Sequence, residues 1–366
     1  MRIRLATVFS GVGAVEQALL RMKIDHEIVF ASDIDKFVKQ SYFANYEIDE
    51  DRWYNDVYDI DGKKYRDKID LFVGGSPCQS FSLVGKQKGF NDNRGLLVYE
   101  FIRLVKEIKP KVFIFENVKG LLSNNDGKTW ETLKAEFESL GYQIEYDILN
   151  AKDYGIPQNR ERLFVVGFKE KRNFSFPPKI KLEITMKDLL EDTPDAKYFL
   201  PEKGIKFVTM DKNLQKKYTQ IDGEIAVCQK ANQQFNWHGD FITQTIDKYY
   251  LSDKVQKYVL AEGTKNFKSR PETDLDIARP LLSTMAKMHR AGIDNYITRE
   301  SRLRKLTPRE CFRLMGFPDT FKIEVSDTQA YKQAGNSIVV DVLIHLLNSI
   351  YYNNKSMMES ENEVKL

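Results

Sequence analysis

Apolar and polar positions along residues 1–168 follow two periods in turn. Short apolar runs that are typical of buried strands lie at residues 3–9, 27–31, 71–73, 111–115, 142–149 and 163–168. Between them, apolar positions recur at helical spacing in residues 15–22, 37–43, 97–108 and 130–140. Strands that alternate with helices favour a parallel, doubly wound sheet with helices on both faces. The pattern therefore predicts an α/β fold for this part of the chain.

The alternation stops at residue 168, and a different pattern follows. Residues 169–172 are charged, Phe176-Pro177-Pro178 interrupts the chain, and residues from about 180 to 300 are polar and aromatic without a clear period. Regular signals return at Thr307-Pro308-Arg309-Glu310, which has the N-cap, the proline and the glutamate of a helix start. That helix is expected to end near Gly316, and a long apolar helix is expected over residues 338–350, after Gly335-Asn336-Ser337. We therefore expect three parts: residues 1–168, an irregular module at 169–324, and a segment at 325–366 that returns to the first part.

Composition narrows the class of protein. The 366-residue chain has 42% apolar and 30% charged residues, which is typical of folded domains and sufficient for two of them. Its net charge of +3 does not by itself indicate a nucleic-acid ligand, because local clusters rather than the total govern steering. The three cysteines and four histidines lie far apart, so we expect neither a disulfide framework nor a bound metal. No apolar run has the length of a signal peptide's apolar region or of a membrane span, so we expect a cytoplasmic protein without membrane contact.

One thiol lies where a nucleophile would be useful. The apolar run at residues 69–73 leads into two glycines, and Ser76-Pro77-Cys78-Gln79 follows. That order predicts a buried strand that enters a tight loop with Cys78 at its tip. Because the thiolate is the attacking species, such a loop must lower the thiol pKa or lie near a base. The alternative is an inert, half-buried cysteine.

A glycine-containing turn joins the first predicted strand to the first predicted helix. Gly11 and Gly13 allow the backbone to approach a ligand closely at the carboxyl edge of the sheet. A dinucleotide fingerprint would require a third glycine at position 16, where this chain has Glu16, so we expect a nucleoside without phosphates. Asp33 ends the second strand and can accept hydrogen bonds from a ribose, and Asp56 can accept from an exocyclic amine. S-adenosylmethionine fits these features.

Six ordered blocks give the chain a resemblance that covers most of its length. They are Phe9-Ser10-Gly11-Val12-Gly13, Pro77-Cys78-Gln79-Ser80-Phe81-Ser82, Glu116-Asn117-Val118, Gln158-Asn159-Arg160-Glu161-Arg162, Leu306-Thr307-Pro308-Arg309-Glu310-Cys311 and Gly335-Asn336-Ser337. In this order the blocks resemble the cytosine-C5 DNA methyltransferases of bacterial restriction-modification systems. The resemblance implies a Rossmann-like catalytic domain with the S-adenosylmethionine methyltransferase fold, and a smaller target-recognition domain between the fourth and fifth blocks. Two positions depart from the family's usual pattern, since Ala14 replaces a glycine and Asp33 stands where many members have glutamate.

The resemblance implies a covalent mechanism at cytosine. The Cys78 thiolate adds to C6 of the ring, which makes C5 nucleophilic toward an activated methyl group. Glu116, kept neutral by burial or a neighbouring negative charge, hydrogen-bonds N3, and Asn117 holds the loop before Cys78. Arg160 and Arg162 are two positions apart, so on extended backbone both face one side and can stabilise the cytosine carbonyl and the thiolate. The alternative for Glu116 is a solvated loop carboxylate, which its position directly after an apolar strand disfavours, and the alternative for the arginines is a surface pair.

The resemblance also implies residues for the cofactor and for DNA. Cofactor contacts are expected from Phe9, Ser10, Gly11, Val12, Gly13, Asp33, Ile34, Asp56, Val57, Pro77, Leu97, Asn336 and Ser337. Because the target atom lies inside the duplex, the base must be flipped out, and the glycine-containing loop at 80–95 is expected to close over it. DNA contacts are expected from Gln79, Ser82, Lys86, Arg94 and Arg290. Sequence readout is expected from the irregular module, with Gln229, Asn232, Gln233, Gln234, His238, Lys287 and His289 as further candidates.

Three other functions compete with DNA methylation. A relative of the family methylates transfer RNA, although the large irregular module favours a duplex reader. A non-catalytic DNA-binding relative is disfavoured by the intact Cys78, Glu116 and arginine pair, and a nicotinamide-dependent dehydrogenase is disfavoured by Glu16. The expected partner is double-stranded DNA. A restriction endonuclease that acts on the same site is a further candidate, and no obligate protein partner is expected.

Overall fold

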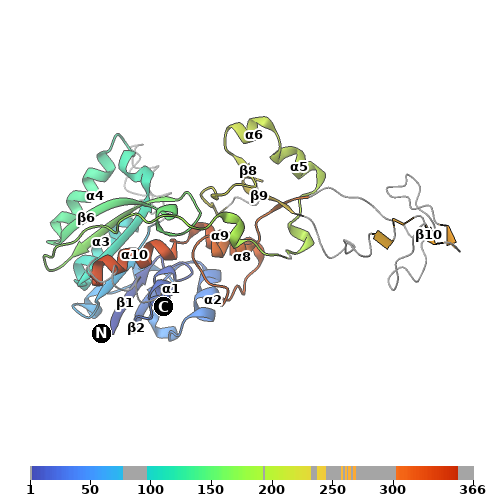
Figure 1. Ribbon diagram of the computed structural model, residues 1–366. Coiled ribbons are helices and arrows are strands. Elements are labelled where there is room, and N and C mark those ends of the chain that lie inside the picture. Colours follow the sequence, from blue (N-terminus) through green and yellow to red (C-terminus); the bar gives the residue numbers. More distant parts are fainter. Residues whose placement is uncertain are drawn as a thin grey trace, which may run out of the picture.

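The computed structural model describes residues 2–76, 97–192, 194–231, 237–244, 257–258, 260–261, 263–264, 267–268 and 302–352. Its main body is built on a seven-stranded sheet with the order β3-β2-β1-β4-β5-β7-β6 (Figure 1). These strands are β1 Ile3–Val8, β2 His26–Ser32, β3 Trp53–Tyr54, β4 Leu71–Gly74, β5 Val112–Val118, β6 Gln143–Asn150 and β7 Glu161–Phe168. The sheet confirms the predicted doubly wound α/β fold.

One strand departs from the expected parallel pairing. Neighbouring strands run parallel from β3 to β5, but β7 is antiparallel to both β5 and β6. The physical reason is the short connection from β6 to β7, at residues 151–160, which contains no helix long enough for a crossover. Expected site residues 160 and 162 therefore lie at the start of an antiparallel strand beside β5.

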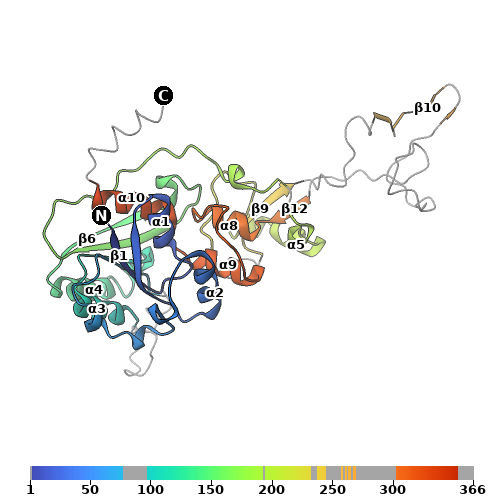
Figure 2. The same cartoon turned by 90° about the horizontal axis from the view of Figure 1, so that it is seen from below.

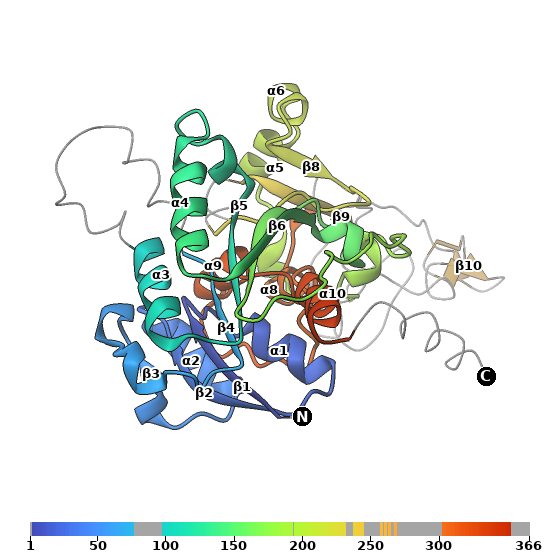
Figure 3. The same ribbon diagram turned by 90° about the vertical axis from the view of Figure 1, so that its left-hand side faces the viewer.

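Apolar residues on both faces of the sheet explain why helices cover both. Along β5, Val112 and Ile114 belong to one core cluster, whereas Phe113 and Phe115 belong to the other. Helices α3 and α4 pack on one face and α1 and α10 on the other (Figure 3). The helices of the chain are α1 Ala14–Arg21, α2 Lys36–Asn45, α3 Leu97–Ile108, α4 Lys128–Ser139, α5 Glu202–Val208, α6 Asp211–Gln215, α8 Pro308–Arg313, α9 Asp327–Asn336 and α10 Val340–Tyr351.

Short 3-10 helices connect many of these elements. They are η1 Glu50–Arg52, η2 Val57–Asp59, η3 Gly62–Tyr65, η5 Lys119–Ser123, η6 Ala151–Tyr154, η7 Met186–Leu189 and η8 Ala196–Tyr198. Several begin at an aspartate whose side chain accepts from the backbone, as Asp56 and Asp61 do. Such caps stabilise turns at the edge of the sheet.

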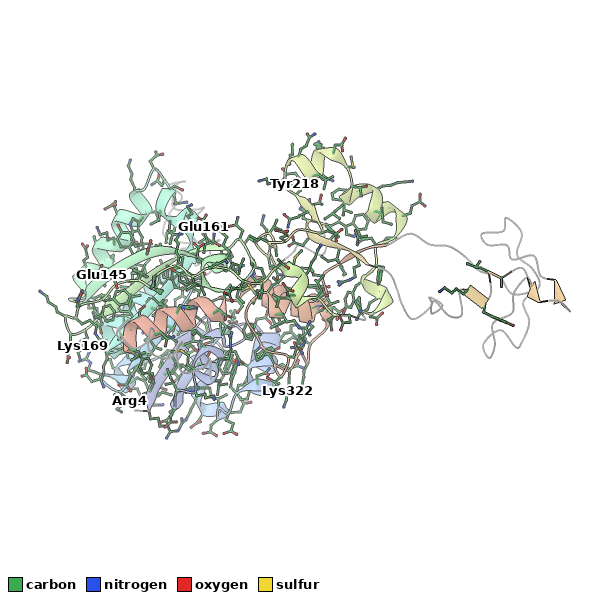
Figure 4. All side chains as sticks on the ribbon, viewed as in Figure 1. Arg4, Glu145, Glu161, Lys169, Tyr218 and Lys322 are labelled. Carbon is green, nitrogen blue, oxygen red and sulfur yellow. The ribbon has the colours of Figure 1, made fainter. Side chains whose placement is uncertain are left out.

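A smaller group of elements, here called the small module, stands apart from the main sheet. It contains β8 Thr219–Ile221, β9 Gly239–Gln244 and β12 Arg302–Lys305, in the order β12-β9-β8, together with α5 and α6. Figure 4 shows Tyr218 on this module, well separated from Arg4 and Lys169 on the main body. Two further strands, β10 Gly263–Thr264 and β11 Phe267–Lys268, pair with each other. The module lies inside the expected region at 169–324, where the short elements leave no clear period in the sequence.

The last part of the chain joins the small module to the main body. Helices α8 and α9 lie between the two, as the views in Figures 1 and 2 agree. The predicted capping box of α8 is confirmed, and its Glu310 is also paired with Arg304 at 2.8 Å, both side chains being fully buried. The sequence did not predict α9, which includes Gly335 and Asn336.

One stretch of the described residues, Asp327–Tyr351, has the length and composition of a membrane span. It is divided into α9 and α10, and its residues Leu343, Leu346 and Leu347 are fully buried in the main core cluster. The apolar character of this stretch is thus accounted for by packing against the sheet.

Candidate active site

A cleft opens at the carboxyl edge of the parallel strands, where ligands bind in sheets of this type. It is lined by residues 7–11 at the end of β1, residues 73–75 at the end of β4, Glu116 of β5, and residues 336–338 at the C-terminal end of α9. Six of the expected site residues meet here, namely Phe9, Ser10, Gly11, Glu116, Asn336 and Ser337. Blocks that are more than 200 residues apart in the sequence therefore form one site.

The turn after β1 requires glycine at position 13. Gly13 has φ 77°, and a Cβ placed on it would lie 2.2 Å from the ring of Tyr46. The Tyr46 hydroxyl donates to the carbonyl oxygens of Val12 at 3.1 Å and Gly13 at 2.7 Å. Phe9 is not a glycine but has φ 53°, so strained backbone lies directly on the cleft. Tyr46 thus supports the turn on the side that faces the core, and the opposite side of the turn is open to a ligand.

Asp33 follows β2 and holds the same turn from the side. Its Oδ2 accepts from the backbone N–H of Gly11 at 3.0 Å, and its Oδ1 accepts from that of Asp35 at 3.0 Å. Burial raises the pKa of Asp33, and these two hydrogen bonds act in the opposite direction. The next side chain, Ile34, is 80% exposed, so an apolar surface stands beside a carboxylate. This pairing suits a ligand that combines hydroxyl groups with a flat ring.

Three further expected cofactor residues, Asp56, Val57 and Leu97, do not line the cleft. Asp56 ends the segment after β3, and its Oδ1 accepts from the N–H of Tyr58 at 3.0 Å. Val57 is only 4% exposed and packs in a core cluster. Leu97 begins α3, while Pro77 lies outside the described residues.

Glu116 lines the cleft and is paired with an arginine. Its Oε1 is 3.1 Å from Nε of Arg162 on β7, and its side chain is 12% exposed. A Cβ placed on Gly75 would lie 2.8 Å from Oε2 of Glu116, so the end of β4 passes closely over the carboxyl group. Burial raises the pKa of Glu116, and the charges of Arg162 and Arg160 act in the opposite direction. The alternative of a solvated loop carboxylate does not describe this side chain.

The two arginines face one side, as their spacing predicts. Nη1 of Arg160 lies 3.7 Å from the sulfur of Cys228, and Nη2 of Arg162 lies 4.0 Å from the same sulfur. Arg160 is 3% exposed, and burial together with the neighbouring Arg162 lowers its pKa to about 10. The thiol of Cys228 therefore lies beside both arginines, although nothing local in the sequence indicates a role for this cysteine.

The two arginines have different partners. The guanidinium of Arg160 donates to the carbonyl oxygens of Gln229, Gly335 and Ser337 at 3.0, 3.1 and 2.8 Å. Its Nε has no partner among the described residues. Arg160 thus ties the end of α9 to the small module, whereas Arg162 is the arginine paired with the carboxylate in the cleft.

Asn117 anchors the segment that leads to the expected nucleophile. Its side-chain amide donates to the carbonyl oxygen of Ser76 at 3.1 Å, and its Oδ1 accepts from the N–H of Val118 at 2.9 Å. This confirms the expected anchoring role of Asn117. The nucleophile and most expected DNA contacts lie outside the described residues: Cys78, Gln79, Ser82, Lys86, Arg94, Asn232, Gln233, Gln234, Lys287, His289 and Arg290.

Gln158 joins the main sheet to the small module. Its Nε2 donates to the carbonyl oxygen of Leu314 at 2.8 Å, and its Oε1 accepts from the N–H of Gln229 at 3.2 Å. A Cβ placed on Gly335 would lie 2.6 Å from the backbone of Lys230 and Ala231, so α9 approaches this segment closely. Gln229, a candidate for base readout, is only 4% exposed and lies in this junction.

Glu16 does not reach the cleft. The side chain is fully buried on the inner side of α1, where its Oε1 accepts from the hydroxyl of Tyr42 at 2.6 Å. The helix turns Glu16 into the core, so the carboxylate itself would not repel a phosphate held at the turn. The third glycine of a dinucleotide fingerprint is still missing at this position.

The structure adds four residues to the site that the sequence did not single out. They are Thr7, Tyr46, Gly75 and Cys228. Gly75 had a detectable signal, since it precedes the Ser-Pro-Cys-Gln loop, but the other three are placed only by the fold. Among the described residues, no group of three or more histidine, cysteine or acidic side chains could hold a metal ion.

The sequence of the chain is similar to those of known proteins. The family model described as C-5 cytosine-specific DNA methylase matches residues 3–352. The type II methyltransferase M.HhaI of Haemophilus parahaemolyticus is 32% identical over 351 residues, covering 95% of this chain and 94% of its own. The type II methyltransferase M.SsoII of Shigella sonnei is 34% identical over 354 residues, covering 93% of this chain and 78% of its own.

Solved structures share the fold. The methyltransferase EhMeth of Entamoeba histolytica has a TM-score of 0.68 at 18% identity, covering 97% of this chain and 99% of its own. A Dnmt2 methyltransferase of S. pombe has a TM-score of 0.67 at 19% identity, covering 99% of this chain and 100% of its own. At these identities the likeness establishes the arrangement of the elements and nothing finer.

Proposed function

The chain belongs to the C-5 cytosine-specific DNA methylase family, and from this premise we propose that it transfers a methyl group from S-adenosylmethionine to C5 of cytosine in a specific duplex DNA sequence. The observation that carries the proposal is the pairing of Glu116 with Arg162 in the cleft that also contains the glycine turn. A carboxyl group and a guanidinium can serve N3 and O2 of one flipped base.

The residues at the edge of the sheet fit S-adenosylmethionine. The half-buried Asp33 carboxylate would accept from ribose hydroxyls, and the exposed Ile34 would cover one face of the adenine. Asp56 would accept from the adenine amino group, and the turn at residues 9–13 would hold the methionine part, with Asn336 opposite. When bound, the cofactor supplies an electrophilic methyl group.

The reaction on the base uses Cys78 and Glu116. The Cys78 thiolate adds to C6 of the flipped cytosine, and Glu116 donates a proton or hydrogen bond to N3. Electron density would move to C5, which would then be able to bond the methyl group that S-adenosylmethionine supplies. Loss of the C5 proton and expulsion of the thiolate then restore the aromatic ring. The raised pKa of Glu116 favours the protonated carboxyl that this scheme needs, and Arg162 keeps the side chain oriented.

The proposed roles in catalysis and DNA reading follow the three expected parts of the chain. Residues 1–168 and the C-terminal segment 325–366 would carry catalysis, and the module at 169–324 would read DNA. Asp240 and Gln158 hold that module against the site, through the segment at 226–231. Because relatives of the chain are named type II methyltransferases, we propose that it protects the recognition site of a restriction endonuclease.

A Cys78→Ser protein tests this function. We expect it to lose methyl transfer to duplex DNA while it retains S-adenosylhomocysteine binding in calorimetry, since a hydroxyl is a far weaker nucleophile than a thiolate. Full activity of the variant would refute the covalent mechanism. Cys311→Ala, in α8 and outside the cleft, is the matched control and should keep its activity.

Substrate and product are tested on the unmodified chain. Methyl incorporation into duplex DNA should greatly exceed incorporation into transfer RNA, and the reverse ratio would favour the transfer-RNA alternative. Bisulfite sequencing of DNA from cells that express the chain should show 5-methylcytosine at one position of one short sequence. This single measurement gives the base, the atom modified and the recognition sequence.

A further inference from the structure

A buried carboxyl lies behind the cofactor turn and has no role in the proposed chemistry. Glu16 is 0% exposed, and among the described residues it has no salt bridge to any lysine or arginine. Its Oε1 is bonded to the Tyr42 hydroxyl at 2.6 Å and to the Thr7 hydroxyl at 3.1 Å. Its Oε2 is buried and has no partner among those residues. An isolated buried carboxylate is costly, so the group needs a reason to be there.

Hydrogen bonds continue from Glu16 to the cleft. The Thr7 hydroxyl is 2.7 Å from the hydroxyl of Ser10, and both residues line the cleft. The Ser10 hydroxyl is also 3.1 Å from the carbonyl oxygen of Ser32, and it accepts from the Ser32 N–H at 3.0 Å. A continuous row of hydroxyl groups thus connects the buried carboxyl with the turn that would hold the cofactor.

The hydrogen bonds in this row of hydroxyl groups can run in either of two directions. Each hydroxyl has one hydrogen to donate. If Ser10 donates to the Ser32 carbonyl, Thr7 must donate to Ser10, and only a protonated Glu16 can then donate to Thr7. If Glu16 is ionised, Thr7 donates to Glu16 and Ser10 donates to Thr7, which takes the Ser10 hydrogen away from Ser32. An ionised Glu16 therefore imposes the second order, whereas a neutral Glu16 with its proton on Oε1 allows the first, in which the Ser10 hydroxyl donates to Ser32.

We propose that Glu16 is a positioning residue of the cofactor site, which acts in its neutral form through Thr7 to orient the Ser10 hydroxyl. The inference rests on the proposed function of the cleft. Burial supports the neutral form, because it raises the pKa of Glu16 more than the hydrogen bonds from Tyr42, Thr7 and the backbone N–H of Glu16, together with the charge of His26, lower it. The titratable groups that face Glu16 are Tyr42 from α2, Tyr46 directly after α2, and His26 from β2.

Calorimetric titration with S-adenosylhomocysteine tests the proposal. Glu16→Gln should bind within about twofold of the unmodified chain, since an amide is neutral and can both donate and accept. Glu16→Leu should bind roughly tenfold more weakly and raise KM for S-adenosylmethionine, with kcat at saturation unchanged, because two polar partners lose their contact. A purely structural role would instead lower kcat and the melting temperature together.

A double-mutant cycle with Ser10→Ala makes the test independent of folding losses. If Glu16 acts through Ser10, the double variant Ser10→Ala/Glu16→Leu should bind no more weakly than Ser10→Ala alone. Should Glu16→Leu fail to fold, Thr7→Val removes the middle link and takes its place in the same cycle. Additive losses, or a Glu16→Leu or Thr7→Val protein that binds like the unmodified chain, would overturn the proposal.

The pH dependence supplies a third readout. Affinity of the unmodified chain, relative to Glu16→Gln, should be full at low pH and fall as pH rises through the raised pKa of Glu16. A ratio that rises with pH would contradict a role for the neutral carboxyl. If the unmodified chain itself does not bind S-adenosylhomocysteine, the proposed cofactor fails, and that outcome is distinct from any failure of Glu16.

Discussion

The main sheet and the small module are held together by different forces. The sheet lies between two extensive apolar clusters, and Phe101 alone makes ring contacts with Phe72, Phe113, Phe115 and Phe137. The buried apolar cluster of the module consists of Leu200, Val208 and Phe241. The two parts therefore differ greatly in the amount of apolar surface that stabilises each.

Polar contacts make up for the small core of the module. The carboxylate of Asp240, 2% exposed on β9, accepts from the N–H of Val227 and from the side chain of Gln220. The Arg304–Glu310 pair then ties β12 to α8. A rigid apolar scaffold thus positions the chemistry, whereas the part expected to read DNA is held by a few directional contacts. Three predictions test this contrast.

The largest effect is expected at Glu116. Glu116→Gln should reduce the rate of methyl transfer by about 10²-fold or more, because general acid–base groups contribute about 10²–10⁴-fold. Cofactor binding should change little, since Asp33 and the glycine turn are untouched. Single-turnover kinetics with duplex DNA measure the rate. Glu161→Gln, an exposed carboxylate on β7 (Figure 4), is the control and should retain the rate.

Removing one aromatic ring from each core should show that the main body and the small module unfold in separate transitions. Phe101→Ala should destabilise the main body by about 3–5 kcal/mol and lower cofactor affinity with it. Phe241→Ala should lower only the transition of the small module and leave S-adenosylhomocysteine binding intact. Calorimetric melting with and without S-adenosylhomocysteine measures both. A single transition that shifts equally in the two variants would show that the parts unfold together, against the contrast drawn here.

The smallest effect concerns pH. Burial raises the pKa of Asp240 to about 7 in the folded protein. The folded state therefore binds this proton more tightly than the unfolded state, so the associated stability is present at low pH and is lost as pH rises through about 7. The loss is on the order of a few kcal/mol. Melting temperatures between pH 5 and 8 should fall less for Asp240→Asn, while the exposed Asp211→Asn should follow the unmodified chain.

Predictions from the sequence were more accurate for the main body than for the small module. Residues 97–108 form α3 as their apolar stripe predicts, and the capping box at 307–310 begins α8. In the small module, β8 and α6 have three and five residues, too few to produce a period. The sequence also did not predict helix α9, because this helix has no clear apolar face. It is held instead by contacts of its polar and small residues with α2 and with the segment at 230–231.

The sequence by itself determined the alternation of strands and helices, the order of the six blocks, and the meeting of strand ends at one edge. These depend on local period and on the geometry of parallel strands, which short segments encode. Only the tertiary structure decided that Glu16 turns into the core, that Arg160 joins α9 to the small module while Arg162 holds Glu116, and that Cys228 stands beside both arginines. Such contacts join residues tens to hundreds of positions apart, and their partners are chosen by the path of the folded chain, which no local spacing records.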